Sequence, residues 1–487
     1  MPRKLTLLTD LYELTMAQGW WAEGKIDVEA CFYAFFRDNP FEGGYAVFCG
    51  ADQVAELVRG FAFTDDDTDY LASLPSPAGT PLFKPEFLDW LRGLELSVDI
   101  DVVEEGTLVF PREPLVRVTG PLLQCQLLEP AILNGINFQT LIATKAARVC
   151  RAAAPHPVSE FGLRRSQGPD GAMSVSRAAY IGGCSSVANV LAGKKYGIPV
   201  GGTHAHSWVM SFDDELAAFR AYAAAMPDNC ILLVDTYDVE QGVRNAITVG
   251  RELAQQGGKL RAIRIDSGDL AWLSCKAREM LDAAGMEDVG IILSNDLDEY
   301  TITSLNDQGA CYTGLGVGTH LAAAWGQPAL GGVYKLSAVR EPGQAWQPRM
   351  KVSEQIYKRT IPGVLDTRRY FNEDGKFAGD LIFDASSAEE PEPIIVDPLD
   401  GQRRKRFDPA QKHVTLLQPL VRKGKLTAMD LAASTAAARR AEQFKHLDDS
   451  VQRFMHPHSY PCGIERKLYE RRKGLAIRMR HADDLYE

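Results

Sequence analysis

The sequence of 487 residues lacks the patterns that mark several classes of protein. Its nine cysteines are widely spaced and never form a C-x-x-C pair, so neither a zinc knuckle nor a disulfide framework is indicated. No uninterrupted apolar run reaches the roughly 18 residues that a membrane helix needs. Asp10 and Glu13 interrupt the segment that would form the apolar part of a signal peptide. The sequence therefore predicts a soluble cytoplasmic protein with reduced thiols and no membrane partner.

Positive charge is also scarce over most of the chain. The sequence has 53 Lys and Arg against 64 Asp and Glu, a net charge of −11, so a broad surface for nucleic acid is not expected. Residues 401–487 are the exception, with 19 Lys and Arg against 10 Asp and Glu. A Pro-, Ser- and charge-rich segment at 385–405 precedes this basic part and predicts a domain boundary. We interpret the basic stretch 464–481 as a solvated helix face.

The hydrophobic pattern of residues 157–336 is typical of alternating strands and helices. Short β-branched runs end near Phe161, Val200, Val234, Ile265, Leu293, Gly314 and Leu336. Between them, residues 239–257 and 270–285 carry apolar side chains at helical spacing. This alternation predicts a parallel barrel or a doubly wound sheet, in which ligands bind at the carboxyl edge of the strands. Residues 1–150 instead predict an antiparallel sheet, followed by a long helix at about 131–152.

Polar segments follow the expected parallel strands. They are EFGLRRSQGPDG (160–171), GGTHAHSW (201–208), DTYD (235–238), RIDSGD (264–269), SNDLDE (294–299) and GLGVGTH (314–320). Glycines in such turns let successive N–H groups approach a phosphate, and Arg supplies forked donors for carboxylate or phosphate. Asp269 and Asp298 are candidates for helix N-caps. Because the segments follow consecutive strands, we expect them to converge on one anion-binding hollow.

His204 and His206 allow two interpretations. Residues two apart on a strand face the same side, and H-x-H also begins the zinc site of metal-dependent amidohydrolases. Such a site needs further histidines on later strands, and between His206 and residue 336 the sequence offers only His320. A metal site is therefore the less favoured alternative.

A family resemblance extends from about Thr6 to beyond Lys467. The chain resembles nicotinate phosphoribosyltransferases in the motifs LLTDLYELTMAQGWW, EFGLRRSQGPDGA, GTHAHSW, LLVDTYD, RIDSGDL, GLGVGT and LGGVYKL, which occur in this order. The resemblance implies an α/β fold in which an irregular, incomplete α/β barrel (146–385) lies between an N-terminal α+β domain (1–145) and a small C-terminal subdomain (386–487). It also implies a homodimer with its active sites at the subunit interface.

The implied reaction joins nicotinate to phosphoribosyl pyrophosphate (PRPP), with ATP as a co-substrate and Mg²⁺ bound with PRPP and ATP. Its products are nicotinate mononucleotide and pyrophosphate, in the salvage branch of NAD biosynthesis. His206 matches the family's phosphorylated histidine, and Asp235 matches the residue that orients it. Asp266 is expected on the ribose side, and His204 falls on a variable position without a catalytic role.

The resemblance also implies two groups of binding residues. Nicotinate is expected to contact Tyr12, Arg165, Thr203 and Arg264, with Tyr12 supplied by the partner subunit. PRPP is expected to contact Ser294, Asn295, Asp296, Gly316, Gly318 and Thr319. No residue is assigned as a direct metal ligand.

Two alternatives to this function stay open. Nicotinamide phosphoribosyltransferase shares the architecture, but its amide substrate favours an acidic acceptor where the segment 182–187 offers Ser185 and Ser186. A catalytically silent member of the family, which only binds nucleotides or a partner protein, would not need His206, Asp235, Arg264 and Asp266 together.

Overall fold

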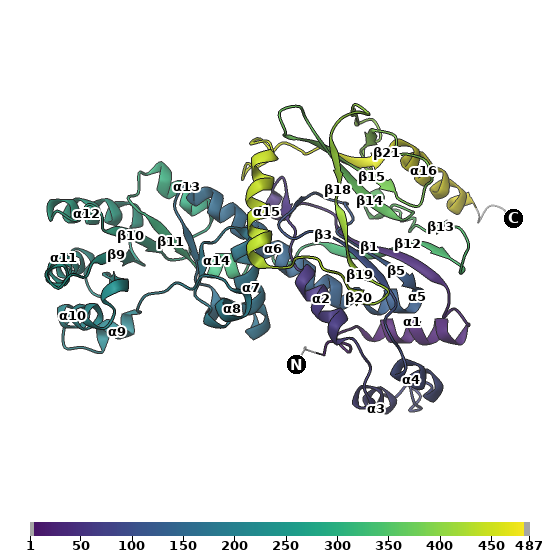
Figure 1. The fold of residues 1–487 in the computed structure, drawn as a ribbon, viewed down its shortest axis with the longest axis horizontal. Coiled ribbons are helices and arrows are strands. Elements are labelled where there is room, and N and C mark those ends of the chain that lie inside the picture. The colour runs from purple at the N-terminus through teal and green to yellow at the C-terminus, as the bar shows by residue number, and fades with distance from the viewer. Residues whose placement is uncertain (1–3, 482–487) are drawn as a thin grey trace. The chain divides into compact units, whose positions relative to one another are not determined.

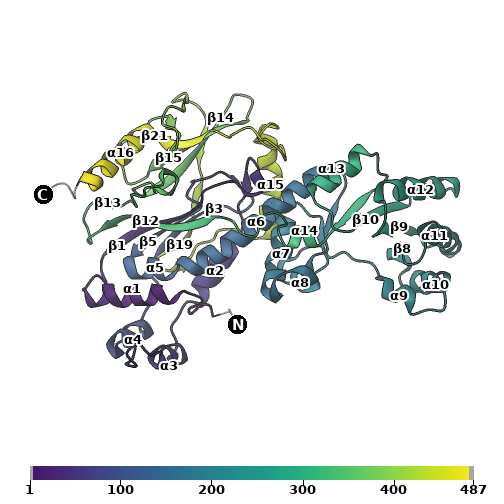
Figure 2. The same cartoon turned by 180° about the vertical axis from the view of Figure 1, so that it is seen from behind.

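The computed structural model describes residues 4–481, and the chain divides into two compact units. The second unit is Ile142–Pro328, and the first combines the chain before it with the chain from Ala329 onward. Residues 329–385, which the sequence analysis assigned to the barrel, therefore belong to the first unit. Helix α6 (Glu129–Ala153) begins in the first unit and ends in the second (Figures 1 and 2).

A seven-stranded antiparallel sheet is the larger sheet of the first unit. Its order is β13 (Gln347–Pro348), β12 (Gly332–Arg340), β1 (Glu29–Phe36), β5 (Val116–Pro121), β3 (Asp99–Val103), β19 (Leu417–Arg422) and β20 (Lys425–Leu426). The antiparallel sheet predicted for the N-terminal region is thus present. Strand β12, whose residue Leu336 was expected to end a parallel strand, instead pairs antiparallel with β1. The rings of Phe32 and Tyr334 stack across this pair with centroids 5.0 Å apart.

The second large sheet of this unit spans the expected boundary at 385–405. Its order is β17 (Arg404–Arg406), β16 (Ile394–Val396), β21 (Cys462–Glu465), β15 (Phe377–Asp384), β14 (Leu365–Phe371) and β18 (His413–Thr415). Strands from the two sides of the boundary, β15 and β21, pair directly with each other, and the apolar run Ile394–Val396 within the boundary segment forms the buried strand β16 beside β21. Tyr33 of β1 packs in one hydrophobic cluster with Ile382 and Ile464. The expected N-terminal domain and C-terminal subdomain therefore share a core.

Helices and one small two-stranded sheet complete the first unit. They are α1 (Leu11–Ala22), α2 (Ala51–Gly60), α3 (Asp65–Ser73), α4 (Pro85–Arg92), α5 (Leu122–Leu127), α15 (Ala433–His446), α16 (Arg466–His481), and the pair β2 (Ala46–Val47) and β4 (Leu108–Val109). Helix α16 is not simply a solvated basic face. Arg472 is buried and donates to the carbonyls of Thr360, Pro398 and Arg359, while Arg466 pairs with Glu392.

The second unit is built on a curled, open parallel sheet, a half barrel. Its order is β7 (Ser186–Val187), β6 (Val158–Glu160), β11 (Gly314–Val317), β10 (Gly290–Ser294), β9 (Leu260–Ile265) and β8 (Cys230–Leu233). Every adjacent pair is parallel. Strands β6, β8, β9 and β10 end within one residue of the predicted ends, whereas β11 begins at Gly314 and Val200 forms only an isolated bridge to Val187.

The helices of the second unit follow its strands in alternation. They are η2 (Leu163–Arg165), α7 (Gly168–Gly182), α8 (Val190–Tyr196), α9 (His206–Met210), α10 (Glu215–Ala225), α11 (Val239–Gln255), α12 (Leu270–Ala283), α13 (Glu299–Asp307) and α14 (Thr319–Ala322). In Figure 2, α10, α11 and α12 lie beside β8, β9 and β10. Asp269 and Asp298 cap α12 and α13 through backbone N–H groups, as predicted. None of the helices between residues 4 and 481 is long and apolar enough to cross a membrane.

The contact between α11 and Val234, the residue after β8, yields a test of this packing. A Cβ atom on Gly242 would overlap the carbonyl oxygen of Val234, so we expect Gly242→Ala to lower the free energy of unfolding by about 1–3 kcal/mol. Gly171 in α7 is a matched control, since its nearest neighbour would be Gln167 Cβ at 3.9 Å. Gly171→Ala should raise the free energy of unfolding by about 0.5–1 kcal/mol. Urea denaturation followed by circular dichroism measures both changes, and equal shifts would contradict the packing argument.

Candidate active site

A cavity of about 380 Å³ lies at the carboxyl ends of the parallel strands, and every residue that lines it belongs to the second unit. Eleven expected site residues line it: Arg165, Thr203, His206, Arg264, Asp266, Ser294, Asn295, Asp296, Gly316, Gly318 and Thr319. Two expected residues do not. Asp235 lies just outside the lining, and Tyr12 lies in α1 of the first unit with 48% of its surface exposed.

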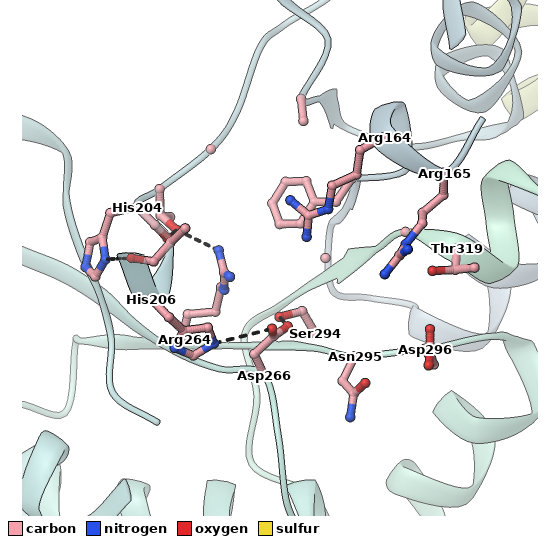
Figure 3. Close-up of a pocket in the computed structure, with 17 residues that line it drawn as sticks. Arg164, Arg165, His204, His206, Arg264, Asp266, Ser294, Asn295, Asp296 and Thr319 are labelled. Carbon is pink, nitrogen blue, oxygen red and sulfur yellow. Dashed lines mark hydrogen bonds and ion pairs between the residues drawn. The ribbon is translucent and has the colours of Figure 1, made fainter. Parts of the chain in front are cut away.

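His206 begins α9 and faces the end of β9 across the cavity (Figure 3). Its Nδ1 lies 3.2 Å from the hydroxyl oxygen of Thr236, which follows β8. Its Nε2 lies 3.9 Å from Oδ2 of Asp266, which follows β9. In the tautomer that carries its proton on Nδ1, the Nδ1–H group donates a hydrogen bond to Thr236. Nε2 then presents its lone pair to the cavity. The arrangement therefore suits a neutral imidazole that acts as a nucleophile.

The Asp235 carboxylate makes other contacts than the one expected for it. Its Oδ2 accepts from the backbone N–H of Asp266 at 2.9 Å and from the Ser267 hydroxyl at 2.6 Å. The sequence analysis assigned the orientation of His206 to Asp235, but the hydrogen-bond partner of the imidazole is the next residue, Thr236. Asp235 instead fixes the turn that carries Asp266.

His204 is part of the packing around the cavity. Residues 201–205 are not in a strand, so His204 and His206 do not share a strand face as the zinc alternative requires. The backbone N–H of Leu233 donates to His204 Nε2 at 3.2 Å, and the ring lies 4.7 Å from that of Tyr222. Burial lowers the pKa of His204, with smaller contributions from nearby Arg264 and His206. Because Nε2 is occupied as an acceptor, His204 is not available as a metal ligand.

Arg264 at the end of β9 presents a partly unused guanidinium group to the cavity. Its Nη1 donates to the Thr203 hydroxyl at 2.8 Å, which fixes the orientation of the side chain. Its Nε is buried and has no hydrogen-bond partner within residues 4–481. Burial lowers the pKa of Arg264, although the neighbouring carboxylates of Asp266 and Asp235 oppose this shift. A buried donor without a partner favours an anionic ligand at this position.

The loop after β10 supplies the acidic side of the cavity. Ser294 donates its hydroxyl to Asp266 Oδ1 at 2.5 Å, which leaves Asp266 Oδ2 facing His206. Asn295 and Asp296 have φ values of 108° and 34°. Residues other than glycine rarely adopt positive φ values. Two such residues in succession indicate that the surrounding structure holds this loop in a defined, strained conformation, as is common at functional sites.

The loops after β6 and β11 interlock on the opposite side. The Phe161 N–H donates to the Val317 carbonyl at 2.8 Å, and a Cβ atom on Gly316 would overlap the Phe161 ring. Gly316 is therefore needed for this packing as well as for the close approach of a ligand. Arg164 and Arg165 extend from the same segment toward the cavity, where Figure 3 shows them across from Asp266 and Asp296.

Three functional positions were missed by the sequence analysis. Arg164 and Phe161 lie in the quoted motif EFGLRR, where the run of two arginines was the available signal for Arg164. Thr236 lies in the quoted motif DTYD. Whether Asp235 or Thr236 faces His206 depends on the direction of the chain after β8, which the sequence does not show. Ser185 and Ser186, which were compared with an acidic residue, do not line the cavity. Their hydroxyls contact the Val158 carbonyl and the Ser159 hydroxyl.

Charges of both signs therefore share the cavity without neutralising one another. Among the described residues, no ion pair joins the guanidinium groups of Arg164, Arg165 and Arg264 to the carboxylates of Asp266 and Asp296. No group of three His, Cys, Asp or Glu side chains able to hold a metal ion occurs in residues 4–481. A divalent ion that binds through substrate phosphates and one or two carboxylates, as Mg²⁺ does, fits Asp266 and Asp296.

Comparison with known proteins gives relatives over almost the whole chain. Sequence models of the N-terminal and C-terminal domains of nicotinate phosphoribosyltransferase match residues 7–137 and 366–472. The nicotinate phosphoribosyltransferase of Bacillus subtilis is 45% identical over 380 residues, which cover 78% of this chain and 76% of the relative. The nicotinate phosphoribosyltransferase of Caenorhabditis elegans is 36% identical, and the alignment covers 95% of this chain and 92% of the relative. The crystal structure of human nicotinic acid phosphoribosyltransferase aligns with a TM-score of 0.83 at 32% identity, over 96% and 99% of the two chains.

The contact between Thr236 and His206 can be tested by NMR. Thr236→Val keeps the shape of the side chain but removes the oxygen that accepts from Nδ1, so the Nδ1–H tautomer of His206 should become less populated. Nitrogen-15 spectra of histidine-labelled protein report this tautomer, with His206→Gln used for assignment. Thr248→Val is the control, because among residues 4–481 the Thr248 hydroxyl contacts only the Arg244 carbonyl in α11. An unchanged tautomer in Thr236→Val would show that Thr236 does not orient the ring.

Proposed function

The chain belongs to the nicotinate phosphoribosyltransferase family, and we propose that its reaction is coupled to ATP hydrolysis through a phosphohistidine at His206. The proposed reaction converts nicotinate, PRPP, ATP and water into nicotinate mononucleotide, pyrophosphate, ADP and phosphate, in the salvage branch of NAD biosynthesis. The observation that supports it best is the unpaired set of Arg and Asp side chains around one imidazole. The anionic phosphates of the substrate need the positive charge of the arginines. The ribose carbon, which becomes positively charged as it reacts, needs the negative charge of the aspartates.

Nicotinate is proposed to bind beside Arg264. A guanidinium group recognises a carboxylate through two parallel N–H donors, and Arg264 retains a buried Nε–H without a partner within the described residues. Thr203 holds the guanidinium group in place, and Arg165 is close enough to line the same cavity. Tyr12 is proposed to reach this site from the partner subunit of a homodimer, where it would cover the flat pyridine ring.

The transfer step is proposed to occur at Asp266. The pyridine nitrogen forms a bond to the anomeric carbon of the ribose as the bond from that carbon to pyrophosphate breaks. The sugar gains oxocarbenium character during this exchange, and a carboxylate beside it stabilises the positive charge. Ser294 holds Asp266 through Oδ1, so Oδ2 keeps a fixed position toward the cavity. Ser294 thereby orients the carboxylate that faces the reacting carbon.

The phosphates of PRPP are proposed to bind along the opposite side of the cavity. The backbone of Gly316 and Gly318 and the Thr319 hydroxyl offer donors to the 5′-phosphate. Asn295 and Asp296 are proposed to contact the ribose and pyrophosphate end. When bound, Mg²⁺ supplies positive charge to the leaving pyrophosphate. Asp266 and Asp296 are the residues of this chain that would face that ion.

ATP is proposed to transfer its terminal phosphate to Nε2 of His206. The proton on Nδ1 stays with Thr236, and Nε2 attacks the phosphorus as the bond to ADP breaks. The phosphate adds negative charge beside Asp266 and near the guanidinium groups of the cavity, which changes the affinity for substrates and products. Water then releases phosphate from the imidazole. Hydrolysis of ATP can in this way drive the synthesis of the nucleotide.

The substrate assignment is tested by product analysis. The protein is incubated with PRPP, Mg²⁺, ATP and either nicotinate or nicotinamide, and the nucleotide products are separated by chromatography. We expect nicotinate mononucleotide as the main product, with kcat/KM for nicotinate at least about 100-fold higher because only the acid pairs with Arg264. Equal use of the two substrates would refute the acid specificity. Absence of any nucleotide product would favour a catalytically silent protein.

The phosphohistidine is tested with His206→Ala. This variant should bind substrates and fold normally but should take up no label from ATP labelled at the terminal phosphate. Slow nucleotide formation should remain, since the ribosyl transfer does not use the imidazole as nucleophile, but ATP hydrolysis should no longer depend on nicotinate. His413→Ala, which alters an exposed histidine of the first unit, is the control and should label normally. Retained coupling in His206→Ala would exclude the role of this residue.

A further inference from the structure

Glu160, the last residue of β6, is a buried carboxyl group outside the proposed machinery. Its side chain has no solvent exposure, and among the described residues no cation forms an ion pair with it. Its Oε1 accepts from the backbone N–H of Gly162, and its Oε2 lies 3.1 Å from the hydroxyl oxygen of Ser176. Burial of an unpaired carboxylate is costly, so its contacts must offset that cost. The contact to Gly162 lies at the start of the loop that enters the cavity.

The turn held by Glu160 carries two guanidinium groups. The Gly162 carbonyl accepts from the Arg165 N–H at 2.8 Å and from the Ser166 hydroxyl at 3.1 Å, which closes the turn η2. Arg164 and Arg165 are exposed and line the cavity, and neither has an ion-pair partner within residues 4–481. Long exposed side chains of this kind depend on the backbone of the turn for their position.

The same turn also fixes the loop after β11. Gly162 packs against Ala322 and the Gly318 carbonyl so closely that a Cβ atom on Gly162 would overlap Ala322. The Phe161 ring occupies the space beside Gly316. A movement of the Gly162 backbone would therefore displace the segment 316–319, whose backbone lines the cavity.

We propose that Glu160 is a positioning residue that holds the turn at Gly162, and with it Arg164, Arg165 and the segment 316–319, in the arrangement that receives the phosphates of PRPP. This inference rests on the proposed function. Glu160 itself touches no ligand, because it is buried behind Phe161 and Gly162 and does not line the cavity. Its effect on binding passes through the backbone N–H of Gly162.

The hydrogen bonds indicate which substitutions should preserve this role. Burial raises the pKa of Glu160, and a protonated carboxyl group can accept from Gly162 while donating to Ser176. Ser176 can accept that bond because its own hydroxyl proton reaches the Ala172 carbonyl at 3.0 Å. The amide of a glutamine has the same acceptor and donor in the same places. Glu160→Gln should therefore keep the turn, whereas Glu160→Ala loses both bonds.

The test compares PRPP binding and kinetics in a set of variants. Glu160→Ala should raise the Kd for PRPP, measured by calorimetry, and the KM for PRPP about tenfold, the factor that corresponds to one hydrogen bond of about 1.4 kcal/mol. The value of kcat should fall less than KM rises, because Asp266 and His206 are held by other loops. Glu160→Gln should stay within about twofold of the wild type, since it retains the hydrogen bonds. Ser176→Ala, which leaves the bond to Gly162 intact, should have a smaller effect than Glu160→Ala.

Glu105→Ala is the matched control for the loss of a buried carboxylate. Glu105 lies in the first unit, is 3% exposed and accepts from the backbone N–H groups of Gly50 and Ala51. Its loss should lower the melting temperature without changing the Kd for PRPP. If Glu160→Ala does not fold, Glu160→Asp replaces it, because the shorter acid keeps the charge but cannot reach both Gly162 and Ser176.

The outcomes separate this inference from the proposed function. Wild-type protein that binds no PRPP would refute the proposed function itself. Wild-type protein that binds PRPP, together with a Glu160→Ala or Glu160→Asp variant that binds equally well, would refute only the role of Glu160. A Glu160→Gln variant as weak as Glu160→Ala would also overturn it, because the charge and not the hydrogen bonds would then be responsible.

Discussion

Hydrogen bonds between successive loops at one edge of the parallel sheet hold the cavity together. Asp235 after β8 accepts from the backbone of Asp266 after β9, and Asp266 in turn accepts from Ser294 at the end of β10. On the other side, Phe161 after β6 donates to Val317 at the end of β11. Parallel pairing brings these strand ends to one edge, and each polar side chain then satisfies a group in the neighbouring loop. The cavity is thus a product of the sheet and not of any single loop.

The parts of this arrangement that depend on local sequence were predictable. Strand ends at Ile265 and Ser294 follow from short apolar runs that stop at polar residues, and the caps Asp269 and Asp298 follow from their places before amphipathic helices. The convergence of eleven expected residues on one cavity follows from the rule that ligands bind at the carboxyl edge of parallel strands.

Long-range pairing and side-chain direction were not predictable. Strand β12 has the composition of a further parallel strand, but it pairs with β1, about 300 positions earlier, which a hydrophobic period cannot reveal. The hydrogen-bond partner of the His206 ring was not predictable for a smaller reason. Adjacent residues at a strand end point in different directions, so whether position 235 or 236 meets His206 depends on the geometry of the turn. Gly316 was assigned to phosphate binding alone, because its contact with Phe161 joins positions far apart in the sequence.

The unpaired charges of the cavity have a cost in stability that bears on their role. Arg264 Nε is a buried donor without a hydrogen-bond partner among the residues that the structure describes, and such a donor destabilises the folded state by about 1–3 kcal/mol. Pairing Arg264 with Asp266 would remove much of that cost, yet Thr203 and Ser294 hold the two side chains apart. Groups held in this way need no rearrangement when a ligand brings the complementary charges, so the energy withheld from folding becomes available for binding. A ligand that supplied only an anion would satisfy Arg264 and leave Asp266 unused, whereas a phosphorylated sugar that becomes cationic at one carbon satisfies both.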